Sequence, residues 1–389
     1  MGFAQKSTIN PVSYSPDSSF IIHARHSPYG RRLGTWSIKH LALSIPILIL
    51  NWNNAADTLA CLQSLQRMEG VDYEVYVLDN GSESEDLSAL RAGFPQDERF
   101  KLLTSPENLG FTRGVNHLLE TVVLPEDYEF VALLNNDTEV DPHWLPSLLA
   151  EARKTQAGMV ASRMINFFDR QHMDNAGHFT LNTGEILPLG HDDPIAEYDQ
   201  PRANAGACAG AALYRVELFR QLGRFDTFFR TGYEDAEFGL RALLCGYECR
   251  YAPDAIVYHK ISRSINKIRD LKYTLKIQVD VFYTVLKCWP AINLIINAPF
   301  FFFKVGTITL MNLVFGRWKF MRVLWTALYV VLITDRASIA RSRRTFFAKA
   351  KPTLPWYAFQ QKLTFFLWFD IRRFYKYVWK REKMVFEKY

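Results

Sequence analysis

Two groups of acidic side chains, about one hundred residues apart, are the parts of this chain best suited to chemistry. The downstream group is Glu234, Asp235 and Glu237, and His259 follows it at the end of another apolar run. The upstream acid, Asp137, follows an apolar run of strand length and two asparagines. Carboxylates with a distant histidine suit a general base beside a divalent cation. Two acidic sites at predicted strand ends indicate an enzyme.

The elements that must position these groups alternate between strand and helix. Apolar runs of strand length occupy 45–52, 74–82, 100–105 and 129–137, and periodic helical segments occupy 57–68 and 110–122. Near-continuous apolar strands separated by helices predict a mostly parallel sheet that helices cover on both faces. Ligands bind beyond the carboxyl ends of such strands. Asn51, Asp79 and Asp137 all fall there, which predicts a nucleotide-sized site at one rim.

Charge divides the chain into three parts. The 389 residues, 49% of them hydrophobic, can bury a large core. The net charge of +6 consists of +4 in residues 1–40, −16 in 41–260 and +18 in 261–389. We therefore predict an N-terminal extension (1–40), a catalytic domain (41–265) and a basic, aromatic helical region (266–389). A basic region on an acidic body favours an anionic partner, either phospholipid or nucleic acid.

Apolar content in the basic region favours the membrane. Its runs at 291–303, 305–315 and 323–334 are each shorter than the ~20 residues that cross a bilayer. A crossing by 291–315 would bury Lys304 at about 3 kcal/mol, so an embedded, non-crossing or re-entrant region is preferred. The last stretch, 336–389, mixes 14 basic residues with aromatic ones, as at an anionic headgroup layer. Binding to nucleic acid is not expected.

The cysteines and the N-terminal residues predict a cytoplasmic catalytic domain. The five cysteines are odd in number and widely spread, as expected of reduced thiols. Residues 1–40 are polar and contain no pattern typical of a signal peptide. Within them, the stretches 20–25 and 35–40 hint at an added strand pair, and a disordered arm is the alternative.

Seven segments occur in the order and approximate spacing of a known enzyme family. They are ILNWNN (49–54), VLDNGS (77–82), ENLGFTRGVN (107–116), LLNNDTEV (133–140), GACAGAALYRVELFRQLGRFD (206–226), YEDAEFGLRALLCGY (233–247) and PDAIVYH (253–259). Together they make residues 45–259 resemble a family-2 glycosyltransferase of the GT-A fold, in its rhamnosyltransferase-like branch. The resemblance implies an α/β, Rossmann-like domain that transfers a sugar from a nucleotide-sugar with inversion and without a covalent enzyme intermediate.

The resemblance also implies a donor site. In it, Asp79 would accept a hydrogen bond from the nucleobase, and the other donor-binding residues would be Asn51, Asn53, Asn108, Gly110, Gly114, Asn116 and Asn136. The residue types alone leave alternatives open. An aspartate before Asn-Gly commonly forms a turn, and glycines at a helix start either admit a diphosphate to the backbone N–H groups or simply belong to a cap.

A metal centre is implied at Asp137, which matches the acid of the family's DxD-type motif. Mg²⁺ or Mn²⁺ would bridge it to the donor diphosphate, because both ions prefer oxygen ligands. The first acid of that motif is Asn135 here, so one carboxylate must hold the ion with help from phosphate oxygens. His259 matches a late histidine that completes the metal shell, although a histidine after an apolar run is commonly a packed residue.

The resemblance assigns the catalytic base to Asp235, the second acid of the family's ED pair. Glu234 beside it would raise one of the two pKa values. Glu237 and Arg241 share a helical face, so they either contact the acceptor or support each other as an ion pair. Gly210 lies in a small-residue loop, which suits either a sugar site or a tight backbone crossing.

The predicted acceptor is a lipid-linked saccharide in bacterial surface polysaccharide assembly. This places the protein at the cytoplasmic face of the inner membrane, peripheral or monotopic. The branch resemblance favours dTDP-rhamnose as donor, with UDP-galactofuranose and UDP-N-acetylglucosamine as alternatives. A hypothesis of another class is a membrane scaffold that retains the sugar-nucleotide fold without catalysis.

Overall fold

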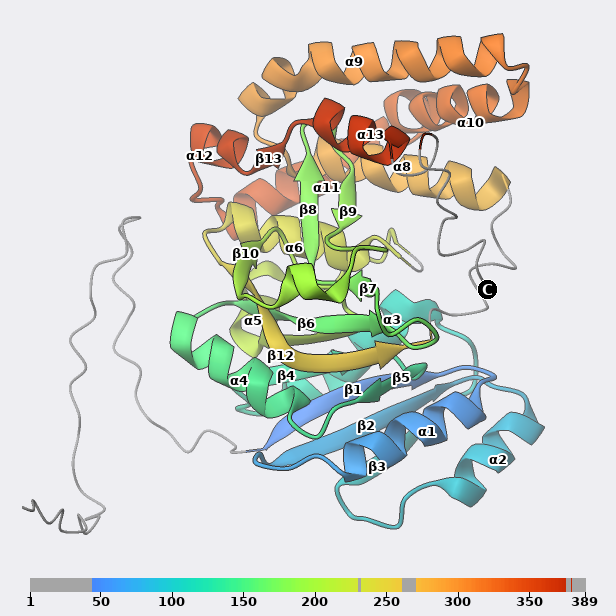
Figure 1. The fold of residues 1–389 in the computed structure, drawn as a ribbon, viewed down its shortest axis with the longest axis vertical. Helices are drawn as coiled ribbons and strands as arrows, with labels where there is room; N and C mark the ends of the chain where they lie inside the picture. The colour runs from blue at the N-terminus through green and yellow to red at the C-terminus, as the bar shows by residue number, and fades with distance from the viewer. Residues whose placement is uncertain (1–43, 230–231, 261–270, 376–378, 380–389) are drawn as a thin grey trace, which may run out of the picture. The chain divides into compact units, whose positions relative to one another are not determined.

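The computed structural model describes residues 44–229, 232–260, 271–375 and 379 (Figure 1). The chain forms two units, residues 1–39 and 40–389, and all described residues belong to the second. The predictions made for 1–40, including the strand pair at 20–25 and 35–40, lie outside the described residues.

The first half of the central sheet is parallel. It contains β1 (Ile45–Asn51), β2 (Tyr73–Asn80), β3 (Phe100–Ser105) and β4 (Phe130–Leu134). β1 pairs with both β2 and β4, and β2 pairs with β3, all in parallel register. All but one of the residues of β1 are buried, because helices cover both faces of the sheet. These strands begin and end close to the predicted positions, and Asn51 lies directly opposite Asp79.

The second half of the sheet is mixed. It contains β5 (Thr138–Val140), β6 (Met159–Asn166), β7 (Met173–Asn175), β10 (Arg202–Asn204), β11 (Ala211–Arg215) and β12 (Cys249–His259). The full order is β10-β12-β6-β11-β4-β1-β2-β3, with β5 paired to β12 and β7 to β6. β6 and β12 are parallel to each other, but β11 joins β4 and β6 in the antiparallel sense. The sheet is therefore more mixed than the alternation of residues 45–137 predicted.

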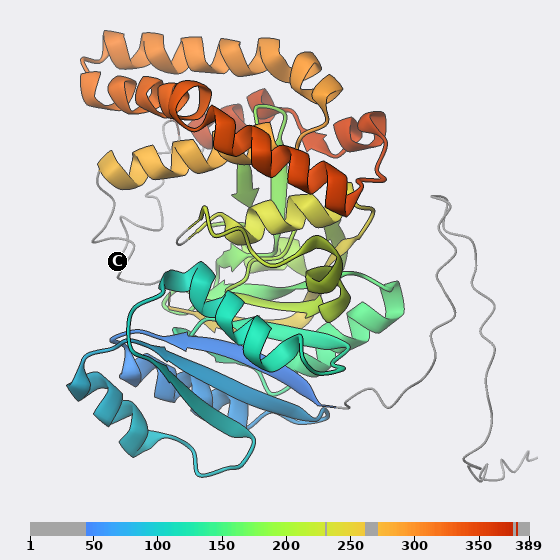
Figure 2. The same ribbon diagram turned by 180° about the vertical axis from the view of Figure 1, so that it is seen from behind.

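Helices cover the two faces of this sheet. They are α1 (Ala55–Gln66), α2 (Ser84–Gly93), α3 (Gly110–Leu118), α4 (Trp144–Thr155), α5 (Val216–Leu222) and α6 (Glu234–Leu244), with short helices η1 (Leu119–Val123) and η2 (Ile195–Tyr198). One core cluster joins α1 and α4 to alternate residues of β1, such as Ile47. A second cluster joins α3, α5 and α6 to the residues of β1 that face the opposite side of the sheet, such as Leu48. Figure 2 shows α3 and α6 from that second side.

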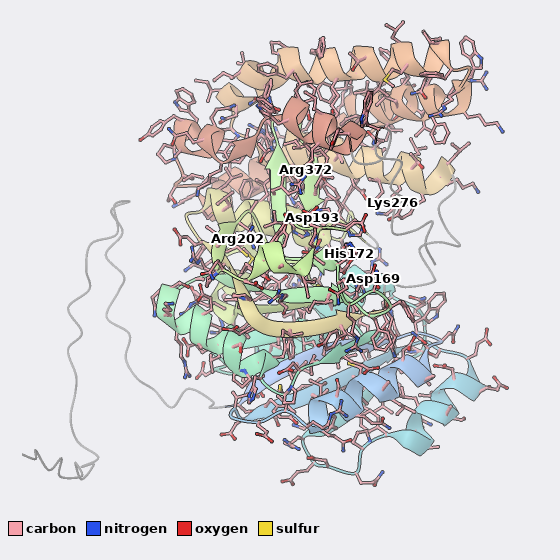
Figure 3. The ribbon with its side chains drawn as sticks, in the orientation of Figure 1. Asp169, His172, Asp193, Arg202, Lys276 and Arg372 are labelled. Carbon is pink, nitrogen blue, oxygen red and sulfur yellow. The ribbon has the colours of Figure 1, made fainter. Side chains whose placement is uncertain are left out.

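A small sheet connects the catalytic domain to the helical region. The hairpin of β8 (His178–Leu181) and β9 (Ile186–Pro188) pairs with β13 (Leu363–Thr364). Figure 1 shows β8 and β9 rising from the central sheet toward the helices. At a second contact, Arg372 lies 3.1 Å from Asp193 (Figure 3). The two regions are thus joined by backbone pairing and an ion pair.

The helical region contains α8 (Leu271–Cys288), α9 (Ala291–Val314), α10 (Trp318–Tyr329), η3 (Val330–Thr334), α11 (Arg336–Ala350), α12 (Trp356–Gln361) and α13 (Phe366–Phe374). α8 packs against α10 and α11, and α9 against α10 and α12. The runs 291–303 and 305–315 form one continuous helix, so Lys304 does not interrupt it. Lys304 Nζ instead lies 2.7 Å from Glu185 Oε1, at the tip of the β8–β9 hairpin.

Candidate active site

Hydrogen bonds connect the carboxyl ends of β1, β2 and β4. Asn51 Nδ2 donates to Asp79 Oδ1 (2.9 Å), and Thr58 Oγ1 donates to Asn51 Oδ1 (2.7 Å). Asn136 Nδ2 donates to Thr58 Oγ1 (2.8 Å). Asp79 also accepts from the backbone N–H of Ser82, as the turn-forming alternative requires. The predicted rim is therefore a connected edge, and contact with a nucleobase stays a prediction.

The turns beside this rim are held by two asparagines. Asn53 has a left-handed backbone (φ 49°), and its Oδ1 accepts from the backbone N–H of Glu83 at 2.8 Å. Asn108 Oδ1 accepts from the N–H of Gly110 at 2.7 Å, just where α3 begins. Gly110 has φ 74°, a conformation that favours glycine. Both asparagines thus shape the loops at which the donor is predicted to bind.

Two predicted donor residues on α3 have structural roles. A β-carbon on Gly114 would lie 3.0 Å from Leu50 Cδ1, so this glycine lets α3 approach β1. Asn116 is buried, and both ends of its amide are bonded to the backbone of Phe225, at 2.9 and 3.1 Å. Both residues thus have packing or structural contacts, and a part in donor binding stays a prediction.

Asp137 belongs to a buried triad of two carboxylates and an imidazole. His259 Nε2 lies 3.2 Å from Asp137 Oδ1, and His259 Nδ1 lies 2.8 Å from Asp174 Oδ2. Asp174 comes from β7 and is itself 3.5 Å from His191. Metal-binding histidines usually donate their second nitrogen to such a carboxylate, which fixes the ring. The residues present therefore fit a divalent ion held by Asp137 and His259.

The charges of the triad favour each other. Burial alone would raise the pKa of Asp137 and Asp174, but the His259 imidazole holds the pKa of both below the ordinary value. Burial would lower the pKa of His259, yet the two carboxylates raise it well above its ordinary value. The two carboxylates therefore favour the charged imidazole, and a metal ion on Nε2 would take the place of its proton.

Asp174 was not identified from the sequence as a site residue. It falls in the 165–205 region, which resembles a variable strand pair and gives no motif around it. Only the pairing of β7 with β6, itself beside β12, brings Asp174 to His259. Metal-binding histidines usually have a carboxylate partner, so a search for the partner of His259 could have found Asp174.

Asp235 lies at the start of α6, after an unusual backbone turn. Gly232 and Tyr233 both have positive φ, 78° and 79°, which is rare for tyrosine and is found mostly at functional sites. Asp235 Oδ1 accepts from the N–H of Ala236 (2.7 Å), and its Oδ2 accepts from the N–H of Ala209 (2.9 Å). Its carboxylate is thus fixed by backbone amides.

Glu234, next to Asp235, is buried. Burial, followed by the charge of Asp235, raises its pKa to about 8. Its Oε2 has no hydrogen-bond partner among the described residues. Glu234 is thus a buried carboxyl with a raised pKa directly beside Asp235.

One small-residue loop, 206–210, brings the two carboxylate centres together. Ala209 donates to Asp235 as described, and the carbonyl of Gly210 accepts from the N–H of Asn135 at 2.8 Å. A β-carbon on Gly210 would lie 3.1 Å from Asn135 Nδ2. Gly206 lies against Gly239 of α6. A β-carbon on Gly239 would lie only 2.7 Å from the Cα of Gly206. The small residues thus allow a tight backbone crossing, which was one of the two predicted roles.

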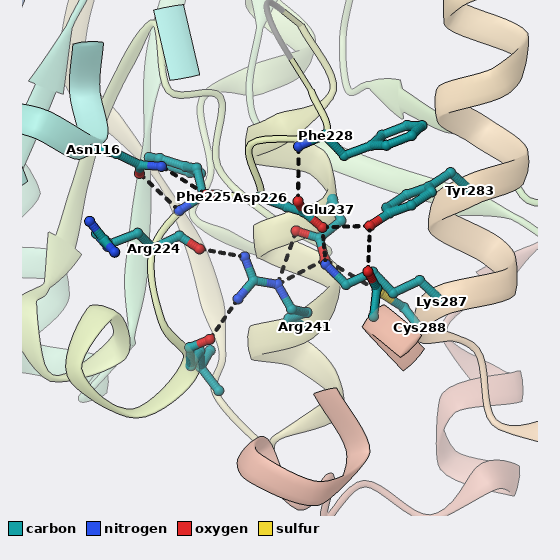
Figure 4. A network of polar contacts seen from close by, with 12 residues as sticks. Asn116, Arg224, Phe225, Asp226, Phe228, Glu237, Arg241, Tyr283, Lys287 and Cys288 are labelled. Carbon is teal, nitrogen blue, oxygen red and sulfur yellow. Dashed lines mark hydrogen bonds and ion pairs between the residues drawn. The ribbon is translucent and has the colours of Figure 1, made fainter. Parts of the chain in front are cut away.

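Glu237 and Arg241 are support residues (Figure 4). Arg241 Nε donates to both oxygens of Glu237, at 2.8 and 2.9 Å, and Arg241 Nη1 and Nη2 donate to two carbonyls that precede α6. Glu237 is fully buried, and Lys287 Nζ of α8 lies 2.7 Å from it and 2.6 Å from Asp226. Since Glu237 is inaccessible, we assign the pair to anchoring α6 on α8.

The comparisons with known proteins point to glycosyltransferases. Residues 47–223 match the model of glycosyl transferase family 2. The chain is 29% identical over 157 residues to the O-antigen biosynthesis protein RfbC of Myxococcus xanthus. The aligned part covers 38% of this chain and 12% of RfbC. It is also 23% identical over 226 residues to an N-acetylglucosaminyltransferase of Rhizobium leguminosarum bv. viciae. That aligned part covers 55% of this chain and 50% of the Rhizobium protein.

The fold resembles that of a solved glycosyltransferase. GalNAc-T7, solved with UDP, GalNAc and Mn²⁺, matches with a TM-score of 0.51 at 15% identity, over 64% of this chain and 48% of that one. The fold is that of GT-A domains, as predicted. Residues 47–223 match the family-2 glycosyltransferase model, which bears out the predicted resemblance. It spans half or less of the length of RfbC and of the Rhizobium transferase.

Proposed function

We propose that this protein is an inverting, metal-dependent glycosyltransferase with a nucleotide-sugar donor. The observation that carries the proposal is the pair of centres joined by loop 206–210, the Asp137–His259–Asp174 triad and the amide-held Asp235. One centre suits a cation, and the other suits a proton acceptor. A non-catalytic scaffold would have no need for both.

Each centre has a separate task in the proposed reaction. Mg²⁺ or Mn²⁺, held by Asp137 and His259, would offset the charge that develops on the leaving diphosphate. Asp235 takes the proton of the acceptor hydroxyl as that oxygen attacks the anomeric carbon of the donor. Glu234, with its raised pKa, stays protonated near neutral pH and adds no second negative charge.

The donor proposal follows the family resemblance. dTDP-rhamnose is the first candidate, and UDP-N-acetylglucosamine and UDP-galactofuranose are the alternatives. The similarity to an O-antigen biosynthesis protein and to an N-acetylglucosaminyltransferase is compatible with the first two. We place the nucleobase at the rim of Asn51 and Asp79, where β1 and β2 end.

The acceptor is proposed to be a lipid-linked saccharide, because the helical region exposes apolar side chains. Among those more than half exposed on α9, α10 and α13 are Ile295, Phe302, Phe303, Leu310, Met311, Val314, Trp318, Trp325, Tyr329 and Trp368. Soluble proteins rarely expose so much contiguous apolar surface. Basic residues adjoin it, among them Arg317, Lys319 and Arg322, as an anionic membrane surface requires.

Contacts of α9 favour embedding over crossing. α9 is long and apolar enough to cross a bilayer, and α10–η3 with α11 meets the same test only as a pair bent by 69°. Yet the polar residues of α9 are bound to the protein. Asn297 donates to Gln360 (2.8 Å), and Lys304 pairs with Glu185. We therefore propose a monotopic protein whose α9 lies in the cytoplasmic leaflet of the bacterial inner membrane.

Thermal protection of the detergent-purified protein by nucleotide-sugars tests the proposal. A bound donor raises the unfolding temperature by mass action. We expect protection by one donor in the presence of Mn²⁺, and its loss in Asp137→Asn. Protection by a UDP-sugar and not by dTDP-rhamnose would reject the proposed donor only. No protection by any donor, with or without Mn²⁺, and no transfer to lipid-linked saccharides would reject the transferase itself.

A further inference from the structure

Three side chains of metal-binding type meet at the candidate base, apart from the Asp137 centre. They are His178, Cys208 and Asp235, and one ligand atom of each lies within 4.8 Å of the other two. His178 begins β8, Cys208 lies in loop 206–210, and Asp235 is in the first turn of α6. Three separate elements thus bring a nitrogen, a sulfur and an oxygen to one point.

The imidazole of His178 lacks a hydrogen-bond partner among the residues that the structure describes. It is 6% exposed, and its Nδ1 has no hydrogen bond among the described residues. Its Nε2 lies 4.0 Å from Asp235 Oδ2, too far for a hydrogen bond. Buried polar groups are nearly always partnered, so an unpartnered imidazole calls for an explanation. A ligand between His178 and Asp235 would supply one.

The ligand types select a cation that differs from the one at Asp137. Imidazole, thiolate and carboxylate together suit Zn²⁺, which binds three protein ligands and keeps one position open in many sites. Mg²⁺ and Mn²⁺ prefer oxygen and gain little from a thiolate. The ligands near Asp137 therefore suit Mg²⁺ or Mn²⁺, whereas the ligands near Asp235 suit a cation that prefers sulfur and nitrogen.

We propose that His178, Cys208 and Asp235 form a second metal site, which binds Zn²⁺ or a similar thiophilic divalent cation and inhibits the enzyme. Binding forms a metal–sulfur bond and releases the thiol proton of Cys208 to solvent. Burial raises the pKa of this thiol well above its ordinary value, so without metal the thiol is neutral. Inhibition rests on the proposed function, because a metal-bound Asp235 cannot take the acceptor proton.

Cd²⁺ binding tests the site without any activity. Cd²⁺ bound to a thiolate gives an ultraviolet charge-transfer band, which we expect to rise to saturation with the full-length protein. Changes around a metal's ligands cost roughly 10–100-fold in affinity, so Cys208→Ser should lose the band and weaken binding at least as much. Cys249→Ser removes another buried thiol, on β12, and should keep the band. Unchanged Cd²⁺ binding in Cys208→Ser, or loss in Cys249→Ser, would overturn the site.

Zn²⁺ inhibition tests the functional half. With Mn²⁺ saturating, Zn²⁺ should inhibit sugar transfer by the natural protein, and inhibition should weaken by about tenfold or more in Cys208→Ser and in His178→Asn. Equal inhibition of all three proteins would place the Zn²⁺ effect elsewhere and reject the inhibitory role. If no transfer is detected at all, the proposed function fails, and the Cd²⁺ result still decides whether the site exists.

Discussion

The two carboxylate centres differ in how completely the protein satisfies them. Asp137 is paired with His259, which is held in turn by Asp174. Among the described residues, the hydrogen bonds to the Asp235 carboxylate come from backbone amides, and Glu234 and His178 nearby each have an unpartnered polar atom. A satisfied triad is ready to exchange a proton for a cation, whereas unsatisfied groups are available to a substrate. The contrast is consistent with the proposed roles, in which the first centre binds charge and the second takes a proton.

The largest expected effect tests the second centre. Asp235→Asn keeps the size of the side chain but removes its ability to take a proton, so sugar transfer should fall by about 10²–10⁴-fold. Donor protection in thermal unfolding should persist, because the donor is assigned to the other centre. The exposed acid Asp254 offers a control, and Asp254→Asn should leave transfer unchanged. Full transfer by Asp235→Asn would show that Asp235 does not take the acceptor proton, so the two centres would not differ as proposed.

Lys287→Met tests whether α8 holds α6, which carries the second centre. Lys287 is buried between Asp226 and Glu237, so its removal leaves carboxylates without their shared cation. Breaking such a buried pair costs about 3 kcal/mol of unfolding free energy, which denaturant unfolding would measure. Lys349 on α11 is exposed, and Lys349→Met should change stability little. Equal stability of both variants would show that the contact with α8 does not hold α6.

Asp174→Asn tests whether Asp174 orients His259 for metal binding at the first centre. An amide in place of the carboxylate orients His259 less firmly, so Mn²⁺ affinity should fall by roughly 10–100-fold. Isothermal titration with Mn²⁺ and donor would measure it. Asp169 and His172 form another Asp–His pair at 2.8 Å, which contains no member of the triad (Figure 3). Asp169→Asn is therefore a matched control, and an equal loss in both variants would contradict a specific role for Asp174.

The same contrast explains what the sequence could predict. Asp137, Asp235 and the strand ends lie in short local motifs, so their types and spacing suffice to find them. Asp174 and His178 lie in the 165–205 region, and their roles depend on strand pairings with partners far along the chain. β11 is equally hard to predict, because nothing within its five residues fixes its antiparallel direction.

The helical region shows the limit of composition. The apolar runs separated at Lys304 read as two short segments, because a lysine within an apolar run suggests a break. The structure forms one helix, because lysine is a good helix former, and Glu185 from the distant β8–β9 hairpin pairs with this lysine. Lys287 likewise has no motif around it. Charge compensation across separate elements therefore decides where these lysines lie.

Glu234→Gln tests the pH dependence of stability. The folded-state pKa of Glu234, about 8, lies above the ordinary value of 4.5, so the folded protein binds its proton more tightly than the unfolded chain does. The contribution of this proton is full below pH 4.5 and is lost as pH rises toward 8. The glutamine cannot ionise, so the variant should gain unfolding temperature relative to the natural protein between pH 5 and 9. Glu217→Gln, at the partly exposed start of α5, should give no such gain. A constant difference at all pH values would show that Glu234 titrates alike in the folded and unfolded chains and has no raised pKa.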